Sequence, residues 1–291
     1  MSTTWDPTTN DEQTEAWNGV LFDRFVQFRH LLTDGLGQHG EVALKVNPPQ
    51  PGDRVLDIGC GFGDTAQRIA GMVGPEGSVL GVDVASRFID FSRADAEANG
   101  VENVTFETMD VEKAEFEQIY DYAFSRFGVQ FFTNPVPALR RVRAGLVPGG
   151  RFCAVVWRQK IDNPWLHKAE LVTKKFVDEP DETDEPTCGP GPFAMAGADT
   201  TSDMLLGAGF EQIGFRRCDI PIKMGDDMDE AIALITALGP AGEAIRLAGE
   251  RAEEVRPQIE AAVREVIAEY EGEDGVWGPA STWIVSAVNP G

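Results

Sequence analysis

The sequence predicts an α/β fold in which a parallel sheet is covered by helices, and two observations carry this prediction. Between residues 53 and 157, five short apolar runs alternate with segments of helical spacing, which is the pattern of strand–helix–strand units. The first apolar run ends in a glycine-rich turn that leads directly into a helical segment. Such a turn presents backbone N–H groups to a ligand, so a binding site is expected there.

The elements of this region follow one another at short intervals. Strands are expected at 54–59, 77–84, 104–110, 151–157 and, together with its following loop, 120–132. Helices are expected between them at 64–73, 86–99 and 134–146. Asp64 is placed to cap the first of these helices, Ser86 opens the second, and Gly100 ends it.

The flanking segments add helices and complete the sheet. Residues 1–50 are expected to form an N-terminal helical cap, 51–157 the ligand-binding core, and 158–291 the rest of the sheet with helical lid insertions. Within the last part we expect helices at 163–177, 202–210 and between 225 and 275, strands at 211–224 and 281–290, and an acidic loop rich in Pro and Gly at 178–201. Pro257 should start or break a helix rather than lie inside one.

Composition excludes several classes of function. The net charge of −23 disfavours nucleic acid as a partner, because that affinity comes mainly from Lys and Arg meeting phosphates. No run of about 18 apolar residues predicts a membrane span, and the polar, acidic N-terminus lacks signal-peptide features, so a cytoplasmic protein is expected. The three histidines are not at metal-ligand spacing, and no metal site is predicted. The cysteines form no CxxC pair and are expected to be reduced: Cys60, Cys153, Cys188 and Cys218.

The glycine-rich turn lies in the segment GDRVLDIGCGFGDTAQRIA, residues 52–70. A phosphate-binding P-loop requires a Gly-Lys-Ser/Thr ending, and this segment contains no lysine. A dinucleotide-binding turn requires G-x-G-x-x-G, whereas here the third glycine comes one residue early and Asp64 stands in its place. An acid at that position would lie unfavourably close to a pyrophosphate. The loop is better suited to a ligand that carries an ammonium as well as a carboxylate.

The stretch VLDIGCGFGD (55–64) resembles the first motif of class I S-adenosylmethionine-dependent methyltransferases, in which an acid is followed one residue later by G-x-G-x-G. The resemblance covers about residues 53–157. FSRFGVQFF (124–132) and ALRRVRAGLVPGGRF (138–152) are similar to small-molecule members, including the quinone-biosynthesis type. This resemblance implies a Rossmann-like, seven-stranded, mostly parallel sheet with helices on both faces, an antiparallel last strand and helical lid segments.

The resemblance also implies which residues bind the cofactor. Asp57 would orient the ammonium of the methionine moiety, Asp83 would hold both ribose hydroxyls, and Asp110 would contact the adenine amino group. A strand-end arginine such as Arg126 is as often an ion-pair partner as a ligand. The full set of expected cofactor-binding residues is Asp57, Gly59, Gly61, Gly63, Asp83, Val84, Asp110, Val111, Ser125 and Arg126.

The expected reaction transfers the methyl group of S-adenosylmethionine to O, N or C of a small, apolar or aromatic acceptor, leaving S-adenosylhomocysteine. His167 is the most attractive candidate base, because histidine titrates near neutral pH. Asp162 and Tyr122 are weaker candidates, and no base is assigned. Six aromatic residues could line the acceptor pocket, or could be ordinary core residues: Trp17, Phe22, Phe25, Phe28, Trp165 and Phe193.

Other functions stay open beside this one. A nicotinamide-dependent oxidoreductase on a related fold is disfavoured by the early third glycine and by Asp64. A non-catalytic protein that binds S-adenosylmethionine is weakly disfavoured by the intact cofactor positions and the large lid. A nucleic-acid methyltransferase is disfavoured by the net charge and by the absence of an NPPY-like or Pro-Cys element. No sequence feature indicates a protein acceptor or an oligomeric state.

Overall fold

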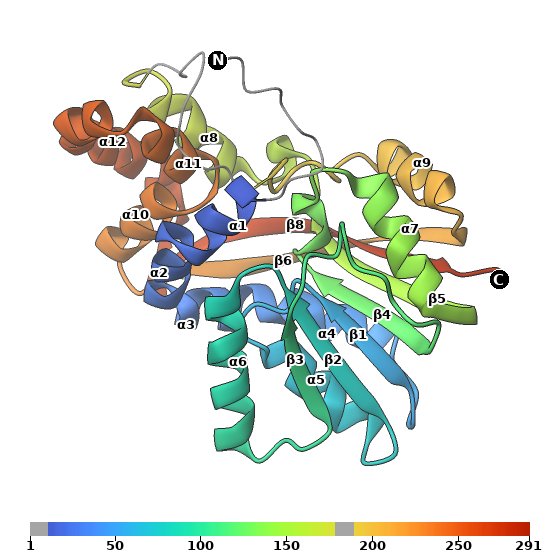
Figure 1. The fold of residues 1–291 in the computed structure, drawn as a ribbon. Helices are drawn as coiled ribbons and strands as arrows, with labels where there is room; N and C mark the ends of the chain where they lie inside the picture. The colour runs from blue at the N-terminus through green and yellow to red at the C-terminus, as the bar shows by residue number, and fades with distance from the viewer. Residues whose placement is uncertain (1–10, 178–188) are drawn as a thin grey trace, which may run out of the picture.

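The computed structural model describes residues 11–177 and 189–291, which fold around one central sheet (Figure 1). The strand order is β3-β2-β1-β4-β5-β8-β6, and the short β7 pairs with β8. Strands β1 to β5 are parallel, whereas β8 lies antiparallel between β5 and β6. The strands are β1 (Arg54–Ile58), β2 (Ser78–Asp83), β3 (Val104–Thr108), β4 (Tyr120–Arg126), β5 (Leu146–Trp157), β6 (Glu211–Gly225), β7 (Glu271–Gly272) and β8 (Gly275–Val288).

Helices cover both faces of the sheet, as predicted. On one face, α4 and α5 bury Leu44 and Ile69 against the strands, and on the other α7 and α9 bury Leu139 and Leu205. The helices are α1 (Asp11–Asn18), α2 (Val20–Gln27), α3 (Arg29–Leu31), the π-helical turn η1 (Leu32–Leu36), α4 (Gly37–Val46), α5 (Asp64–Val73), α6 (Ser86–Asn99), α7 (Pro135–Gly145), α8 (Pro164–Thr173), α9 (Ala198–Ala208), α10 (Met228–Ala237), α11 (Gly239–Ala248) and α12 (Glu250–Ile267), with 3₁₀ turns η2 (Val129–Phe131), η3 (Lys160–Asp162) and η4 (Ala268–Tyr270).

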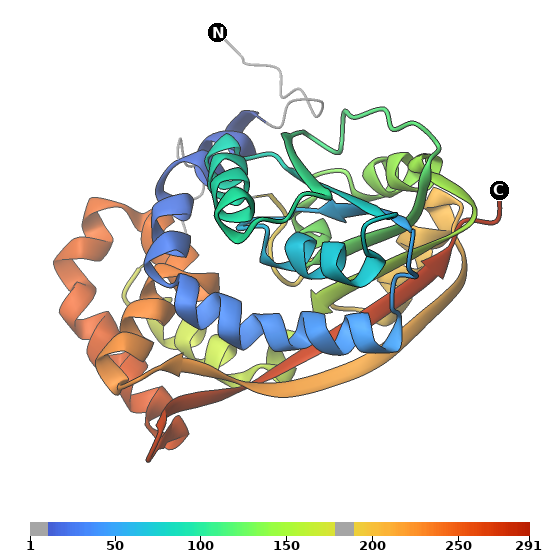
Figure 2. The same cartoon turned by 90° about the horizontal axis from the view of Figure 1, so that it is seen from below.

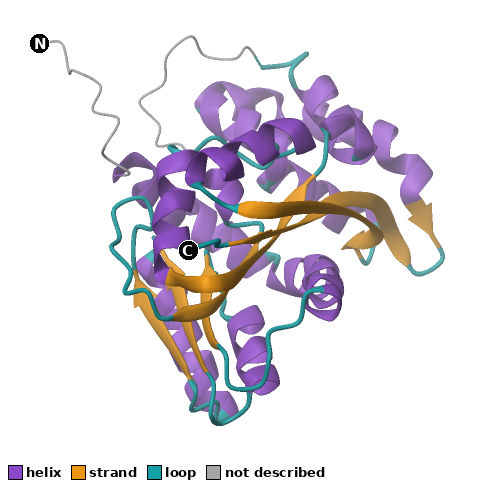
Figure 3. Ribbon diagram, turned by 90° about the vertical axis from the view of Figure 1, so that its right-hand side faces the viewer, coloured by secondary structure: helices purple, strands orange, loops and turns teal. Residues whose placement is uncertain are grey.

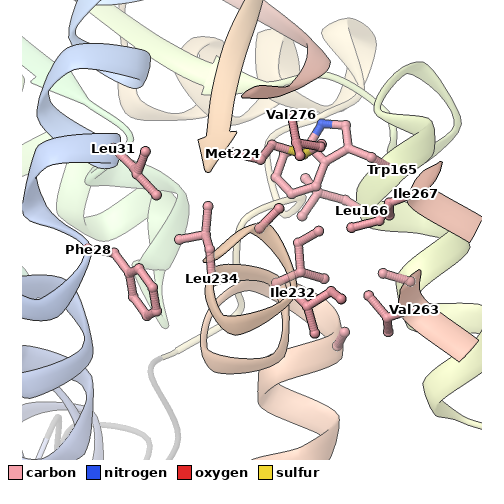
Figure 4. Packing of buried hydrophobic residues seen from close by; sticks show 14 of the residues in the cluster. Phe28, Leu31, Trp165, Leu166, Met224, Ile232, Leu234, Val263, Ile267 and Val276 are labelled. Carbon is pink, nitrogen blue, oxygen red and sulfur yellow. The ribbon is translucent and has the colours of Figure 1, made fainter. Parts of the chain in front are cut away.

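Four helices, α8 and α10 to α12, form a separate apolar cluster, the lid cluster, at one end of the molecule, away from α7 and α9 (Figure 1). We call them the lid helices. The far ends of β6 and β8 leave the rest of the sheet as a long curved ribbon (Figure 3) and contribute Met224 and Val276 to this cluster. From the N-terminal part, Leu31 points toward Leu234 of α10 (Figure 4). The lid helices are therefore held by the same strands that complete the sheet.

The N-terminal helices connect the lid cluster with the apolar core on one face of the sheet. Helix α4 lies alongside the long strands β6 and β8 (Figure 2). The π-helical turn η1 joins it to α3, and side chains on both sides of this turn reach the interior. Within the described residues, no single helix combines the length and apolar composition needed to cross a bilayer; α10 and α11 reach both only as a bent pair.

Most predicted elements are confirmed, and α5 and α6 have the predicted limits. The strand count differs by one, because the two-residue β7 folds back on the start of β8. Strand β8 also begins six residues earlier than predicted. Its first part contains two glycines and a proline, which are not typical of strands, yet Pro279 pairs with Pro221 in the ribbon. The predicted 178–201 loop lies partly outside the described residues, and α9 begins already at Ala198.

Two predictions about helix ends are wrong. Gly63, with a φ of 77°, is the N-cap of α5, and the carboxylate of Asp64 bonds Arg126 instead of capping the helix. Pro257 lies inside α12 rather than at a helix boundary. Both Pro257 and Glu253, whose carbonyl would have received its missing N–H, are exposed, so that carbonyl stays accessible to water. Burial of Ile259 and Val263 against the lid cluster holds the helix together across the proline.

Candidate functional site

A cavity of about 870 Å³ opens at the carboxyl ends of β1, β2 and β4. This volume is near the upper end of the roughly 300–1,000 Å³ typical of ligand pockets. The core sheet forms one side of the wall, which we call the cofactor side and define by Asp57, Gly59, Gly61, Asp83 and Asp110. The other side, which we call the lid side, is defined by Trp157, Lys160, Trp165, Glu170 and Phe193. The site lies where ligands bind in parallel α/β sheets.

The glycine loop between β1 and α5 requires glycine for two different reasons. Gly59 has a φ of 66°, and a Cβ atom there would lie 2.9 Å from the Cα atom of Gly128. The loops after β1 and β4 can therefore approach only where neither residue has a side chain. At Gly61, with a φ of 53°, a Cβ atom would meet nothing within 4 Å. Gly61 lines the cavity, so its backbone is open to a ligand.

Asp57 is 1% exposed and belongs to the wall on the cofactor side of the cavity. Burial raises its pKa to about 7; the charge of Arg126 opposes this shift, and those of Asp64 and Asp83 add to it. Its Oδ2 atom is buried and has no hydrogen-bond partner. A buried carboxylate oxygen without a partner costs free energy, so a cationic group in the cavity would be stabilised beside it.

Asp83, at the end of β2, organises the loop that surrounds it. Its Oδ2 accepts a hydrogen bond of 3.0 Å from the N–H of Gly61, and its Oδ1 accepts one of 3.0 Å from the N–H of Ala85. Burial raises the pKa of Asp83, and these backbone donors oppose the shift. Asp83 and Val84 both line the cavity.

Asp110 and Val111 follow β3 and also line the cavity. The Oδ1 atom of Asp110 accepts a hydrogen bond of 2.9 Å from the N–H of Glu112, and its Oδ2 lies 3.3 Å from the Nζ of Lys113. Val111 is buried and presents an apolar surface beside the carboxylate. Three acids from three neighbouring strands thus line one cavity.

Ser125 and Gly63 are brought to the loop but not to the cavity wall. The hydroxyl of Ser125 donates a 2.8 Å hydrogen bond to the carbonyl of Ile58 and accepts one of 3.2 Å from the N–H of Val129. It therefore joins the ends of β1 and β4 and has no access to a ligand. A Cβ atom at Gly63 would lie within 3 Å of Phe106, so this glycine serves packing.

Arg126 lines the cavity and is also an ion-pair partner of Asp64. Its Nη2 lies 2.9 Å and 2.7 Å from the two carboxylate oxygens of Asp64. A Cβ atom at Gly40 of α4 would come 3.1 Å from the Cδ of Arg126. Helix α4 therefore packs directly on the arginine stem and holds the guanidinium at the cavity wall.

None of the three candidate bases lines the cavity. On α8, Leu166, Glu170 and the adjoining Lys174 face it at intervals of four residues, which places His167 on a different side of the helix. The hydroxyl of Tyr122 donates a 2.7 Å hydrogen bond to the carbonyl of Asn47, and burial raises its pKa well above the usual range. Asp162 forms an ion pair of 3.0 Å with Arg158.

Four of the six predicted aromatic residues line the cavity: Trp17, Phe25, Trp165 and Phe193. Phe22 packs with Phe88, and Phe28 belongs to the lid cluster. Phe127 also lines the cavity but was not predicted from the sequence; its ring centroid lies 5.1 Å from that of Trp157. Phe127 has a φ of 61°, which is uncommon for a residue other than glycine and occurs often at functional sites. The sequence does show a Phe-Gly pair, Phe127-Gly128, directly after the fourth strand, and this pair could have indicated the site.

A charge cluster around Glu170 on the lid side was not predicted from the sequence. Glu170 of α8 has a side chain 9% exposed and lies 2.5 Å from the Nζ of Lys160 and 3.1 Å from that of Lys174. Burial by itself raises the pKa of Glu170, but the hydrogen bonds from the two lysines outweigh it and lower the pKa. The i,i+4 spacing of Glu170 and Lys174 in the sequence could have indicated their ion pair. Within the described part of the chain, no group of residues could hold a metal ion.

Comparison with known proteins places this geometry in a family. A family model described as a methyltransferase domain matches residues 49–200, just over half of the chain. Aklanonic acid methyltransferase DauC of Streptomyces sp. (strain C5) is 35% identical over 122 residues, which are 41% of this chain and 56% of that protein. The ubiquinone/menaquinone biosynthesis C-methyltransferase UbiE of Ectopseudomonas mendocina (strain ymp) is 35% identical over 127 residues, 43% of this chain and 49% of that protein. The match therefore spans about half the length of these curated relatives.

Solved structures show the same fold. The YcgJ protein from Bacillus subtilis has a TM-score of 0.56 at 17% identity, covering 87% of this chain and 99% of that chain. Phosphoethanolamine N-methyltransferase 2 from Haemonchus contortus, in complex with S-adenosyl-L-methionine, has a TM-score of 0.51 at 18% identity, covering 87% of this chain and 53% of that chain. The glycine loop, the three strand-end acids and the family match lead to one conclusion: the chain belongs to the methyltransferase-domain family.

Proposed function

We propose that this protein transfers the methyl group of S-adenosylmethionine to O, N or C of a small, apolar or aromatic acceptor. The proposal rests above all on Asp57, which lines the cavity and whose buried carboxylate has an oxygen without a hydrogen-bond partner. Asp83 and Asp110 line the same cavity. A ligand with a cationic amino-acid end and a polar nucleoside end matches this arrangement of acids.

The residues present fit this cofactor. Asp57 would hold its ammonium, Asp83 its ribose hydroxyls, and Asp110 its adenine amino group. The open backbone at Gly61 leaves space for the ligand between these acids. Val84 and Val111 add apolar wall on this side of the cavity. Arg126, which lines the cavity and bonds Asp64, would meet the carboxylate of the methionine moiety.

When bound, S-adenosylmethionine supplies a methyl carbon that is already electrophilic. What remains for the chain is to align the acceptor and to exclude water. The N-terminal helices and the lid helices surround the cavity with aromatic side chains, including Trp17, Phe25 and Trp165. This aromatic wall favours an apolar or aromatic acceptor. The names of two relatives refer to quinones, which belong to the same class of molecule.

We assign no general base. Among the described wall residues there is no histidine, and the carboxylate of Glu170 is bound by two lysines. An acceptor that arrives ionised needs no base, whereas a neutral one would lose its proton to solvent or to a group that its own binding brings into place.

Calorimetric titration with S-adenosylhomocysteine tests the cofactor assignment, with NADH as the comparison ligand. We expect S-adenosylhomocysteine to bind and NADH not to bind. Binding of NADH alone would replace the proposal by an oxidoreductase. Transfer is tested by formation of S-adenosylhomocysteine from S-adenosylmethionine in the presence of hydroxylated naphthoquinones and phenols. Cofactor binding without product for any of these acceptors would favour a non-catalytic protein.

A further inference from the structure

The two sides of the cavity carry opposite charge. On the cofactor side the charged wall residues are Asp57, Asp83, Asp110 and Arg126, which leaves an excess of negative charge. Among the described residues of the lid side they are Lys160, Glu170, Lys174, Lys223 and Glu243, three lysines against two glutamates. The chain has only seven lysines and a net charge of −23, yet three of those lysines line this wall. A positive surface inside an acidic protein selects for an anion.

The centre of this positive surface is the pair Lys160 and Glu170. The Nζ of Lys160 lies 2.7 Å and 2.5 Å from the two carboxylate oxygens of Glu170, which is nearly buried. Because Lys174 also pairs with Glu170, one carboxylate is shared between two ammonium groups. An ammonium has three N–H donors, so Lys160 keeps one for a ligand after its two bonds to Glu170.

The surroundings of Lys160 place an aromatic ligand next to this ammonium. Its Nζ lies 5.8 Å from the ring centroid of Phe193, which itself lies 6.4 Å from that of Trp157. Trp165 and Leu166 continue the apolar wall. Glu170 holds Lys160 in place, so little side-chain entropy remains to be lost when a ligand binds. A flat apolar body among these rings with an anionic oxygen at Lys160 satisfies both features.

We propose that the methyl acceptor carries an anionic oxygen, either a carboxylate or an ionised phenol or enol, and that Lys160 is the residue that selects it. This inference rests on the proposed function, because it concerns the acceptor that shares the cavity with the cofactor. Glu170 is the positioning residue for Lys160. The charge separation orders the ternary complex: the cationic cofactor lies against the acids of the sheet and the anionic acceptor against the lid.

The test uses the full chain saturated with S-adenosylhomocysteine and three naphthyl probes. 2-Naphthoate is a carboxylate, 2,4-dinitro-1-naphthol is ionised at pH 7, and 2-naphthamide is neutral. Affinities are measured by quenching of tryptophan fluorescence, with calorimetry for the coloured probe. We expect at least one anion to bind about tenfold more tightly than the amide, the gain typical of a charge-assisted hydrogen bond. The tighter of the two anions identifies the carboxylate or the phenolate as the group recognised.

Variants connect this preference to one residue. Lys160→Met should abolish the preference for the anion, and Lys160→Arg should retain most of it. Lys168→Met is the matched control, because Lys168 lies on α8, pairs with Glu269 and does not line the cavity. It should leave all three affinities unchanged, and each variant should bind S-adenosylhomocysteine as the wild type does.

The outcomes separate this inference from the proposed function. If S-adenosylhomocysteine does not bind, the proposed function fails. If it binds but the anions bind no better than the amide, or do not bind at all, only the inference fails. A preference that persists in Lys160→Met also overturns the assignment of Lys160.

Discussion

The two sides of the central cavity differ in how their residues are held. On the cofactor side, Asp57, Asp83 and Asp110 stand at the ends of three adjacent parallel strands, so the sheet itself sets their spacing. On the lid side, Lys160, Trp165 and Phe193 come from a 3₁₀ turn, a helix and an irregular segment. The first side can be recognised from local sequence spacing, whereas the second depends on how distant segments pack. The predictions below test this difference, beginning with the largest effect.

Gly59→Ala should cause the largest loss. Its Cβ atom would lie 2.9 Å from the Cα of Gly128, and a φ of 66° is unfavourable for alanine. We expect roughly 2–4 kcal/mol of destabilisation and a strong loss of S-adenosylhomocysteine affinity. Urea unfolding and calorimetry measure both. The control Gly71→Ala lies in α5 with open space around it and should stabilise by about 0.5–1 kcal/mol. Equal behaviour of the two variants would contradict the close approach of the loops.

Asp57→Asn should stabilise the free protein at high pH while weakening cofactor binding. Burial raises the pKa of Asp57 to about 7 in the folded chain, so the unfolded chain releases this proton at lower pH. The free energy of unfolding of the wild type should therefore fall, relative to the variant, as pH rises from about 4 to about 7. By pH 8 the difference should reach up to about 4 kcal/mol.

Urea unfolding of both proteins at pH 4.5 and pH 8 measures this difference, with Asp90→Asn on the exposed side of α6 as the control. A difference of the same size at both pH values would show that Asp57 does not titrate in this window. Calorimetry should show S-adenosylhomocysteine binding at least about tenfold more weakly to Asp57→Asn, because the ammonium loses its charged partner.

Asp83→Ala should cost about 1–3 kcal/mol of cofactor affinity through lost charge-assisted hydrogen bonds. The same change frees the N–H groups of Gly61 and Ala85, so a modest loss of stability should accompany it. Calorimetry of the variant against Asp90→Ala separates the two effects. Unchanged affinity would remove Asp83 from the site.

His167→Ala should have the smallest effect. It tests whether a lid-side residue that does not line the cavity affects binding or turnover. His167 does not line the cavity, whereas its helix neighbours Leu166 and Glu170 do. We expect S-adenosylhomocysteine affinity, and turnover with any active acceptor, to stay within about twofold of the wild type. A large loss of turnover at unchanged cofactor affinity would restore His167 as a base and require α8 to turn when the acceptor binds.

Much of the sheet and of the cofactor side could be predicted from sequence. Helices α5 and α6 have the predicted limits, because local signals determine helix ends there: a glycine before α5 and Gly100 after α6. Ser125 was expected at the cofactor but does not line the cavity, and the sequence alone could not show this. A serine hydroxyl at a strand end can reach a ligand or the neighbouring backbone, and here the carbonyl of Ile58 lies within reach.

The sequence by itself determined the alternation of strands and helices, the glycine turn and the three acids at strand ends. These depend on residues close in the chain and on the rule that parallel strands end at one edge of a sheet. Only the tertiary structure decided that Asp57 has an oxygen without a partner, that His167 lies off the cavity wall, and that Lys160 meets both Glu170 and Phe193. Burial, helix phase and contacts between distant segments decide such features, because each depends on what packs against the residue rather than on its neighbours in sequence.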